Sequence, residues 1–163
     1  MPKRLRMYFE SSIWRRLVDV HSPRRTLTYR LLTIARSRHV VLASRVVVHE
    51  LKEIPDKVLR KKALDRFWRT DPLLITTRPS VSRIAAELLQ RGGWTDRRLA
   101  DMLHIGYAIA GEADILVTWD ISDLARERTR RLVAGIGRQE GFQAPDIATP
   151  AEVLVEWLGT KIP

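Results

Sequence analysis

The stretch Ile115-Leu116-Val117-Thr118-Trp119-Asp120 contains an unbroken apolar run that is followed by an acid. A strand that is apolar without alternation is typical of a parallel sheet, because helices cover both faces of such a sheet. Residues 115–117 are therefore predicted to form a buried parallel strand, with Asp120 just after its carboxyl end. Because open parallel sheets bind their ligands at that end, the stretch indicates both a fold class and the place of a site.

Two earlier segments repeat this arrangement. Residues 7–9 are a short β-prone run followed by Glu10, and residues 40–43 are an apolar strand followed by Ser44, which is suited to cap a helix. Strands that alternate with helices predict a three-layer α/β fold with a mainly parallel central sheet. The helices are expected after Ser12 and over residues 44–54, 57–68, 81–91, 95–110, 124–141 and 150–157, with short extended pieces at 73–75 and 147–148.

The composition is that of a single globular domain spanning residues 1–163, with 45% hydrophobic and 29% charged residues. Lys and Arg number 29 against 19 Asp and Glu, and the net charge of +10 favours a polyanionic partner, although an arginine-rich solvated surface would give the same excess. The chain has no cysteine, which excludes disulfides and thiolate metal sites and makes a cytoplasmic location the expectation. No apolar run is long enough for a signal peptide or a membrane span.

Four acids stand where a functional site is expected. Glu10 and Asp120 follow predicted strands, so both should emerge at the carboxyl edge of the sheet. Glu50 and Asp101 fall within helices, on the faces that those helices should bury: Asp101 shares its face with Ile105. Because a buried carboxylate costs several kcal/mol unless something compensates its charge, these acids need partners.

Two kinds of partner are open for these acids. An arginine could neutralise any single acid in a structural ion pair, whereas four acids at one sheet edge are better served by a divalent metal. Hard oxygen ligands suit Mg²⁺ or Mn²⁺. Such a metal activates a water for attack on a phosphodiester, so the acids indicate hydrolysis of a nucleic-acid backbone.

Other residues near these acids have competing interpretations. Asp123 could be an auxiliary acid, but a helix N-cap is the favoured role. His104 could orient Asp101 or contact substrate, and a hydrogen-bonded histidine packed in the helix layer is at least as good an interpretation. Trp119 is interpreted as a wall of the core rather than a platform for bases. Arg97 and Arg98, at the start of the helix of Asp101, are the predicted phosphate contacts.

In their order and approximate spacing, four segments resemble the motifs of PIN domains, and the likeness is closest to the VapC-like toxin ribonucleases of type II toxin-antitoxin systems. The segments are Tyr8–Ser12, Val47–Leu51, Ala100–Ile105 and Leu116–Asp120, and residues 141–142 and 147–152 resemble the tail of that family. The resemblance therefore covers nearly the whole chain.

This resemblance implies a Mg²⁺- or Mn²⁺-dependent endoribonuclease. The family's metal ligands match Glu10, Glu50, Asp101 and Asp120, and Ser12 matches a hydroxyl position beside the site. The likeness further implies RNA as substrate, a small antitoxin protein as partner, and a homodimer. One residue departs from the family pattern, because Glu10 stands where Asp is usual, and its extra methylene predicts reduced activity or a shifted metal preference.

Two other functions compete with an RNA phosphodiesterase. A non-catalytic PIN scaffold that binds nucleic acid or a partner protein would explain both Glu10 and the positive charge. A phosphotransfer enzyme of another Mg²⁺-using α/β fold is disfavoured, because no Asp-x-Asp follows the first strand and the chain has no Gly-rich phosphate loop.

Overall fold

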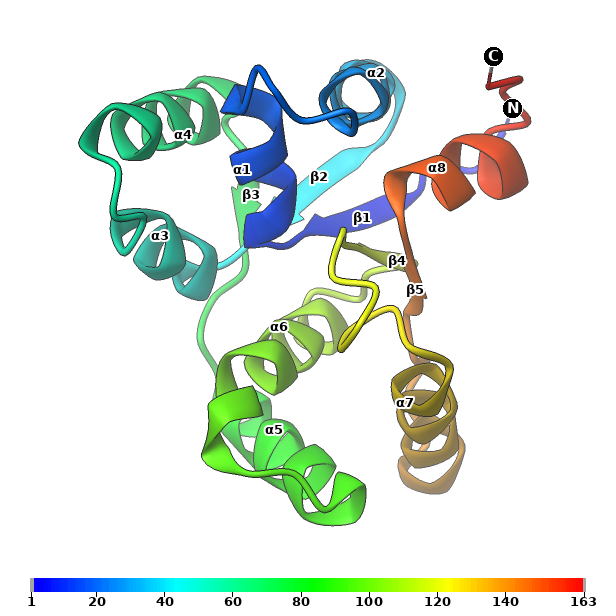
Figure 1. The fold of residues 1–163 in the computed structure, drawn as a ribbon. Helices are drawn as coiled ribbons and strands as arrows, with labels where there is room; N and C mark the ends of the chain where they lie inside the picture. Colours follow the sequence, from blue (N-terminus) through cyan, green and yellow to red (C-terminus); the bar gives the residue numbers. More distant parts are fainter. Residues whose placement is uncertain (1, 163) are drawn as a thin grey trace.

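A five-stranded parallel sheet forms the centre of the structure (Figure 1). The structure is a computed structural model and describes residues 2–162. Every pairing in the sheet is parallel, which confirms the predicted fold class. The strands lie in the order β3-β2-β1-β4-β5, and they are β1 (Arg6–Phe9), β2 (Val40–Ala43), β3 (Leu73–Leu74), β4 (Ile115–Val117) and β5 (Asp146–Ala148).

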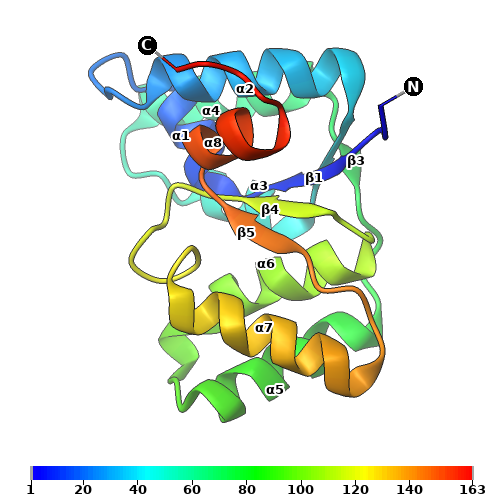
Figure 2. The same ribbon diagram turned by 90° about the vertical axis from the view of Figure 1, so that its right-hand side faces the viewer.

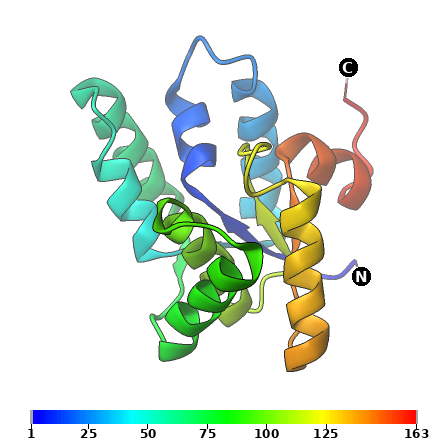
Figure 3. The same cartoon turned by 60° about the horizontal axis from the view of Figure 1, so that its bottom comes forward.

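Helices cover both faces of this sheet, so the predicted three layers are confirmed (Figures 1 and 2). One face carries α1 (Ser11–Val18), α2 (Arg25–Arg38) and α8 (Pro150–Glu152), and a π-helical turn (Val153–Trp157) continues α8. The other face carries α5 (Pro79–Gly92), α6 (Leu99–Ala110) and α7 (Glu127–Glu140), which Figure 3 shows together, and a 3₁₀ turn (Asp96–Arg98) precedes α6. Beside α1 lie α3 (Arg45–Lys52) and α4 (Lys57–Thr70).

The central strand β1 anchors the core. Met7, Tyr8 and Phe9 are fully buried, as a strand covered on both faces requires. Tyr8 lies opposite Leu42 of β2 on one side and opposite Leu116 of β4 on the other. Burying each large apolar side chain stabilises the fold by about 1.5–3 kcal/mol, and this burial fixes the register of the strands that carry the site.

Two helices differ from the sequence prediction. The helix α2 was not predicted, because its buried face consists only of Thr28, Leu31, Leu32 and Ala35 among polar residues. The helix α7 begins at Glu127 rather than at residue 124. Residues 121–126 instead fold back as a loop, in which the backbone N–H of Ala125 donates to the carbonyl of Asp120 at 2.8 Å.

The strand order reverses between β1 and β4. From β1 the chain proceeds to β2 and β3 on one side, and it then returns to β4 and β5 on the other. The carboxyl ends of β1 and β4 are adjacent at this reversal, where open α/β sheets leave a crevice for ligands. Glu10 and Thr118 directly follow these two strands, so the fold brings them to that crevice.

None of the helices within residues 2–162 has both the length and the hydropathy to cross a bilayer.

Candidate metal centre

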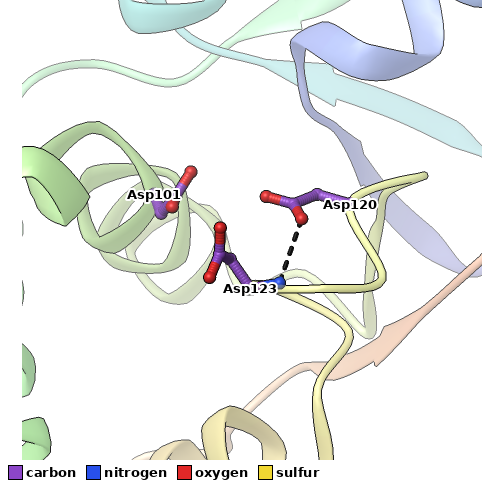
Figure 4. A group of neighbouring side chains, drawn as sticks. All are labelled: Asp101, Asp120 and Asp123. Atoms are coloured by element: carbon purple, nitrogen blue, oxygen red, sulfur yellow. Dashed lines mark hydrogen bonds between the residues drawn. The ribbon is translucent and has the colours of Figure 1, made fainter.

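Three aspartates gather at this edge of the sheet (Figure 4). Asp101 comes from the first turn of α6, whereas Asp120 and Asp123 come from the loop that follows β4. One carboxylate oxygen of each lies within 4.8 Å of the other two. The loop is held in shape by its own hydrogen bonds, because the N–H of Asp123 and the hydroxyl of Ser122 each donate to Oδ1 of Asp120 at 3.0 Å.

The electrostatics of this cluster are only partly balanced. Burial and the neighbouring charge of Asp120 raise the pKa of Asp101 to about 6. The guanidinium of Arg98 stacks on Trp94 at 4.0 Å, and its Nε lies 3.8 Å from both Asp101 and Asp123. That separation is too long for a hydrogen bond. Within residues 2–162, Nε and Nη2 of Arg98 are in fact buried without a hydrogen-bond partner.

The donor set fits a divalent cation. Three hard carboxylate oxygens within 4.8 Å of one another repel one another, and the guanidinium of Arg98 adds a single positive charge without a hydrogen bond to them. Oxygen donors of this kind are the ligands that Mg²⁺ and Mn²⁺ prefer. Asp101, Asp120 and Asp123 could therefore hold such an ion, with the remaining positions open to water or substrate.

Glu10 lies behind this cluster and is almost completely buried. Its carboxylate caps α1 by accepting from the N–H of Ser12 at 3.0 Å, and it also accepts from the hydroxyls of Ser12 and Thr118. Burial raises the pKa of Glu10, although the charge of His104 and the bonds from Ser12 act in the opposite direction. The extra methylene of Glu10 is thus accommodated by a set of hydrogen bonds inside the protein.

Glu50, which is partly buried, forms an ion pair with the buried His104. Burial alone would raise the pKa of Glu50, yet its bonds to His104 and Ser11 lower it below the usual value. For His104 burial alone would lower the pKa, and the bond to Glu50 raises it instead. The other ring nitrogen of His104 is hydrogen-bonded to the hydroxyl of Tyr8 at 2.8 Å, and that hydroxyl also bonds to Ser44 at 2.7 Å.

Two hydroxyl groups connect the buried acid Glu10 to the partly buried aspartate cluster. Thr118 donates to Glu10 at 2.9 Å and accepts from the backbone N–H of Asp120 at 2.9 Å. Ser12 donates to Glu10 and accepts from the backbone N–H of Trp119 at 2.8 Å. Glu10 therefore fixes the backbone that carries Asp120, which is a positioning role of the kind that orients metal ligands.

The four acids singled out in the sequence thus occupy two places. Asp101 and Asp120 belong to the aspartate cluster, while Glu10 and Glu50 lie outside it and are bonded to protein groups. A direct metal contact by Glu10 or Glu50 stays a prediction. The favoured role of Asp123 as a helix cap is wrong, because α7 begins four residues later and its N-cap is Arg126.

The other predicted residues are also placed. Trp119 is a wall of the core, as predicted: it is 7% exposed and its Nε1 donates to Thr28 at 2.7 Å. His104 is the buried, hydrogen-bonded histidine of the second interpretation. Arg97 is exposed beside the start of α6, whereas Arg98 is turned toward the acids. Their contacts with phosphate stay predictions.

Several residues of the buried network were missed in the sequence. Thr118 and Tyr8 received no role, and Ser44 was expected only as a helix cap, whereas its side chain bonds to Tyr8 and makes no capping bond. A common signal was available, because Glu10, Ser44 and Thr118 each directly follow a strand. Polar groups at that position of a parallel sheet converge, so each of them was a candidate partner for the acids.

No protein-family model matches the sequence, and no curated protein sequence matches it. Solved structures do match. VapBC2 from Rickettsia felis, crystallised with a DNA fragment from its promoter, has a TM-score of 0.57 at 16% identity and covers 89% of this chain and 98% of its own. VapC20 from Mycobacterium tuberculosis, a toxin that cleaves the sarcin-ricin loop, has a TM-score of 0.59 at 18% identity. The match covers 73% of this chain and 92% of VapC20.

VapBC-1 from nontypeable Haemophilus influenzae likewise has a TM-score of 0.58 at 10% identity and covers 90% of this chain and 99% of its own. At such low identity these likenesses concern the fold. The five-stranded parallel sheet, its strand order and its helices over both faces agree with the PIN expectation. The fold of this chain is therefore that of the PIN domains of VapC toxins.

Proposed function

We propose that this protein is a metal-dependent endoribonuclease that hydrolyses RNA phosphodiester bonds. The observation that carries the proposal is the cluster of Asp101, Asp120 and Asp123, whose carboxylate oxygens lie within 4.8 Å of one another in a PIN-like fold. The net charge of +10 supports a polyanionic substrate. The structural likeness to VapC20, a toxin that cleaves the sarcin-ricin loop, supports the same reaction class.

The three aspartates would hold Mg²⁺ or Mn²⁺. When bound, such an ion supplies an activated water and stabilises the charge that develops on the phosphate. The protein's own contribution is to hold the ligands in place. Asp120 is fixed through Thr118 and Glu10, and Asp101 is carried by α6, which the His104–Glu50 ion pair ties to α3.

Cleavage of labelled single-stranded RNA tests this proposal. The purified protein is expected to cut RNA with Mg²⁺ or Mn²⁺ and not with EDTA. Asp120→Asn should lower the rate by about a hundredfold or more, since even groups that only orient a metal ligand contribute 10–100-fold. Glu53→Gln is the matched control, because it removes an exposed acid and should leave the rate unchanged. Equal cleavage by Asp120→Asn and the unchanged protein would contradict the proposal.

A second candidate is a catalytically weak or inactive scaffold that binds RNA or a partner protein. One observation favours it: Glu10 and Glu50, two of the four acids matching the family's metal ligands, are bonded to protein groups. This alternative predicts salt-sensitive RNA binding without cleavage under either metal.

The partners proposed with the nuclease are an antitoxin protein and a second copy of the chain, in the cytoplasm. The Rickettsia and Haemophilus structures are of VapBC proteins, which supports the antitoxin. Exposed apolar side chains support an interface: Trp68 and Leu73 are each 54% exposed, and a hollow of about 890 Å³ lies between Trp68, Leu74 and Leu103. Both partners are tested by the mass of the purified protein in solution, alone and after expression with its genomic neighbour.

A further inference from the structure

A hollow of about 410 Å³ opens beside the aspartate cluster. It shares Asp120 with the cluster and is lined by residues of α1, of the turn before α2 and of the loop after β4, namely Ser12, Arg16, Arg24, Trp119, Asp120, Ile121 and Ser122. Two arginines and one acid therefore face the same space. A substrate whose phosphate reached the aspartates would have an adjacent nucleotide within reach of this hollow.

Arg24 is held in this hollow by contacts that leave its charge unpaired. Its guanidinium lies over the ring of Trp119 at 4.9 Å, and Nη1 donates to the carbonyl of Trp119 at 3.4 Å. Trp119 is fixed in turn, because its Nε1 donates to Thr28, whose own hydroxyl donates to the carbonyl of Arg24 at 2.7 Å. Within residues 2–162, no acid forms an ion pair with Arg24.

Arg16 approaches the same hollow from α1. It lies one helical turn after Ser12, so the two side chains share a face of the helix. Its one ion-pair contact in the described part of the chain is with Asp19 at 4.0 Å, and both side chains are more than a third exposed. An exposed pair at that distance contributes little, so Arg16 is free to bind another anion.

Several other arginines around the cluster already have partners within the protein. Arg98 faces Asp101 and Asp123, and Arg128 donates to the carbonyl of Gly92 at 2.7 Å. On α7, Arg130 and Arg131 pair with Glu152 and Glu127. Arg16 and Arg24 line the same hollow as Asp120, so a phosphate beside Asp120 would lie within reach of both guanidinium groups.

We propose that Arg16 and Arg24 form a subsite for the backbone phosphate of the nucleotide next to the one that is cut. The planar guanidinium binds two phosphate oxygens at once, and two such groups offset the repulsion between a polyanion and the clustered aspartates. Ile121, which is 52% exposed at the rim, offers apolar surface to the sugar or base. This inference rests on the proposed function, because it concerns the RNA substrate of the same site.

RNA binding without metal tests the subsite separately from cleavage. The dissociation constant of a labelled single-stranded RNA is measured in EDTA at several salt concentrations, for the unchanged protein, Arg16→Gln, Arg24→Gln, Arg24→Lys and the double Gln variant. Arg36→Gln is the control, because it removes an exposed arginine of α2 without a side-chain bond within residues 2–162. Circular dichroism and thermal melting confirm that each variant is folded.

Each Gln variant at the subsite is expected to bind about tenfold more weakly, the loss for one charge-assisted contact. The slope of log affinity against log salt should become less negative by about 0.7 for each contact removed. Arg24→Lys should retain the slope while losing part of the affinity, and Arg36→Gln should match the unchanged protein.

Affinities for Arg16→Gln and Arg24→Gln equal to that of Arg36→Gln would overturn the subsite, as would the absence of RNA binding by the unchanged protein. Failure of the proposed function appears differently, as RNA binding that depends on both arginines without cleavage under Mg²⁺ or Mn²⁺.

Discussion

At the scale of single residues, Asp101 is the member of the cluster whose pKa is clearly raised. Burial and the charge of Asp120 raise its pKa to about 6, so the folded chain holds a proton there that the unfolded chain releases near pH 4. Between these values the folded state binds more protons, and the free energy of unfolding therefore falls as pH rises. Without metal, the charged cluster destabilises the fold above about pH 6.

The substitution Asp101→Asn should remove this destabilisation. In EDTA at about pH 7.5, the variant is expected to melt at a higher temperature than the unchanged protein, because one of the mutually repelling charges is gone. At about pH 5, where Asp101 is mostly protonated, the two melting temperatures should converge. A difference that is the same at both pH values would show that Asp101 has an ordinary pKa in the folded protein.

The ion pair between His104 and Glu50 should stabilise the fold. Replacing His104 by Gln leaves Glu50 partly buried without its cation and is expected to cost about 3 kcal/mol of unfolding free energy near pH 5.5. The raised pKa of His104 means that its contribution is present below about pH 6.5 and is lost as pH rises through its folded pKa. The lowered pKa of Glu50 means that its contribution is lost as pH falls.

Urea unfolding of the His104→Gln variant at several pH values measures this contribution. Glu53→Gln, which changes an exposed acid near Glu50, should be nearly neutral. A loss of stability for His104→Gln no larger than that for Glu53→Gln would contradict the account of the pair.

At the scale of elements, the helix that carries Asp101 is positioned by close packing. Gly106 of α6 faces α5, and a Cβ at this position would lie 2.8 Å from the carbonyl oxygen of Val81. A backbone oxygen cannot move away as a flexible side chain can, so the two helices would have to separate. The distance between α5 and α6 therefore depends on the absence of a side chain at Gly106.

The substitution Gly106→Ala is expected to destabilise the protein by about 1–3 kcal/mol, the usual effect of overpacking. Gly135→Ala is the matched control on α7, where a Cβ would meet only Nη2 of Arg138 at 3.9 Å. The higher helix propensity of Ala should make that control neutral or stabilising by up to about 1 kcal/mol. Chemical denaturation measures the free energy of unfolding of both variants. Equal values for Gly106→Ala and Gly135→Ala would exclude a close contact at Gly106.

The elements also show what the sequence could predict. Apolar runs with an acid or hydroxyl after them located β1, β2 and β4, because burial on both faces leaves a clear pattern. The narrow apolar face of α2 gave no such pattern, and residues 124–126 were predicted to be helical although they belong to the loop before α7. Because Asp is a common helix cap, Asp123 was predicted to cap a helix, but that helix begins later. Its membership of the aspartate cluster was therefore only the less favoured prediction.

At the scale of the whole molecule, an acidic cluster lies in a protein with a net charge of +10. The sequence alone indicated the carboxyl edge of the sheet, since acids follow two of the predicted strands, and its composition favoured a polyanionic partner. Which arginines are free could not be predicted, because ion pairs such as Arg130 with Glu152 join residues far apart in the chain. Long-range attraction of RNA by this charge is expected to weaken as salt rises.

Titration of Mn²⁺ into the metal-free protein by calorimetry tests the central claim most directly. Saturable binding to the unchanged protein is expected near neutral pH, above the pKa of about 6 of Asp101, and binding should be weakened at least about tenfold in Asp120→Asn and Asp123→Asn. Glu53→Gln should bind as the unchanged protein does. Equal affinity in all four proteins, or no binding to any of them, would contradict a metal site formed by Asp101, Asp120 and Asp123.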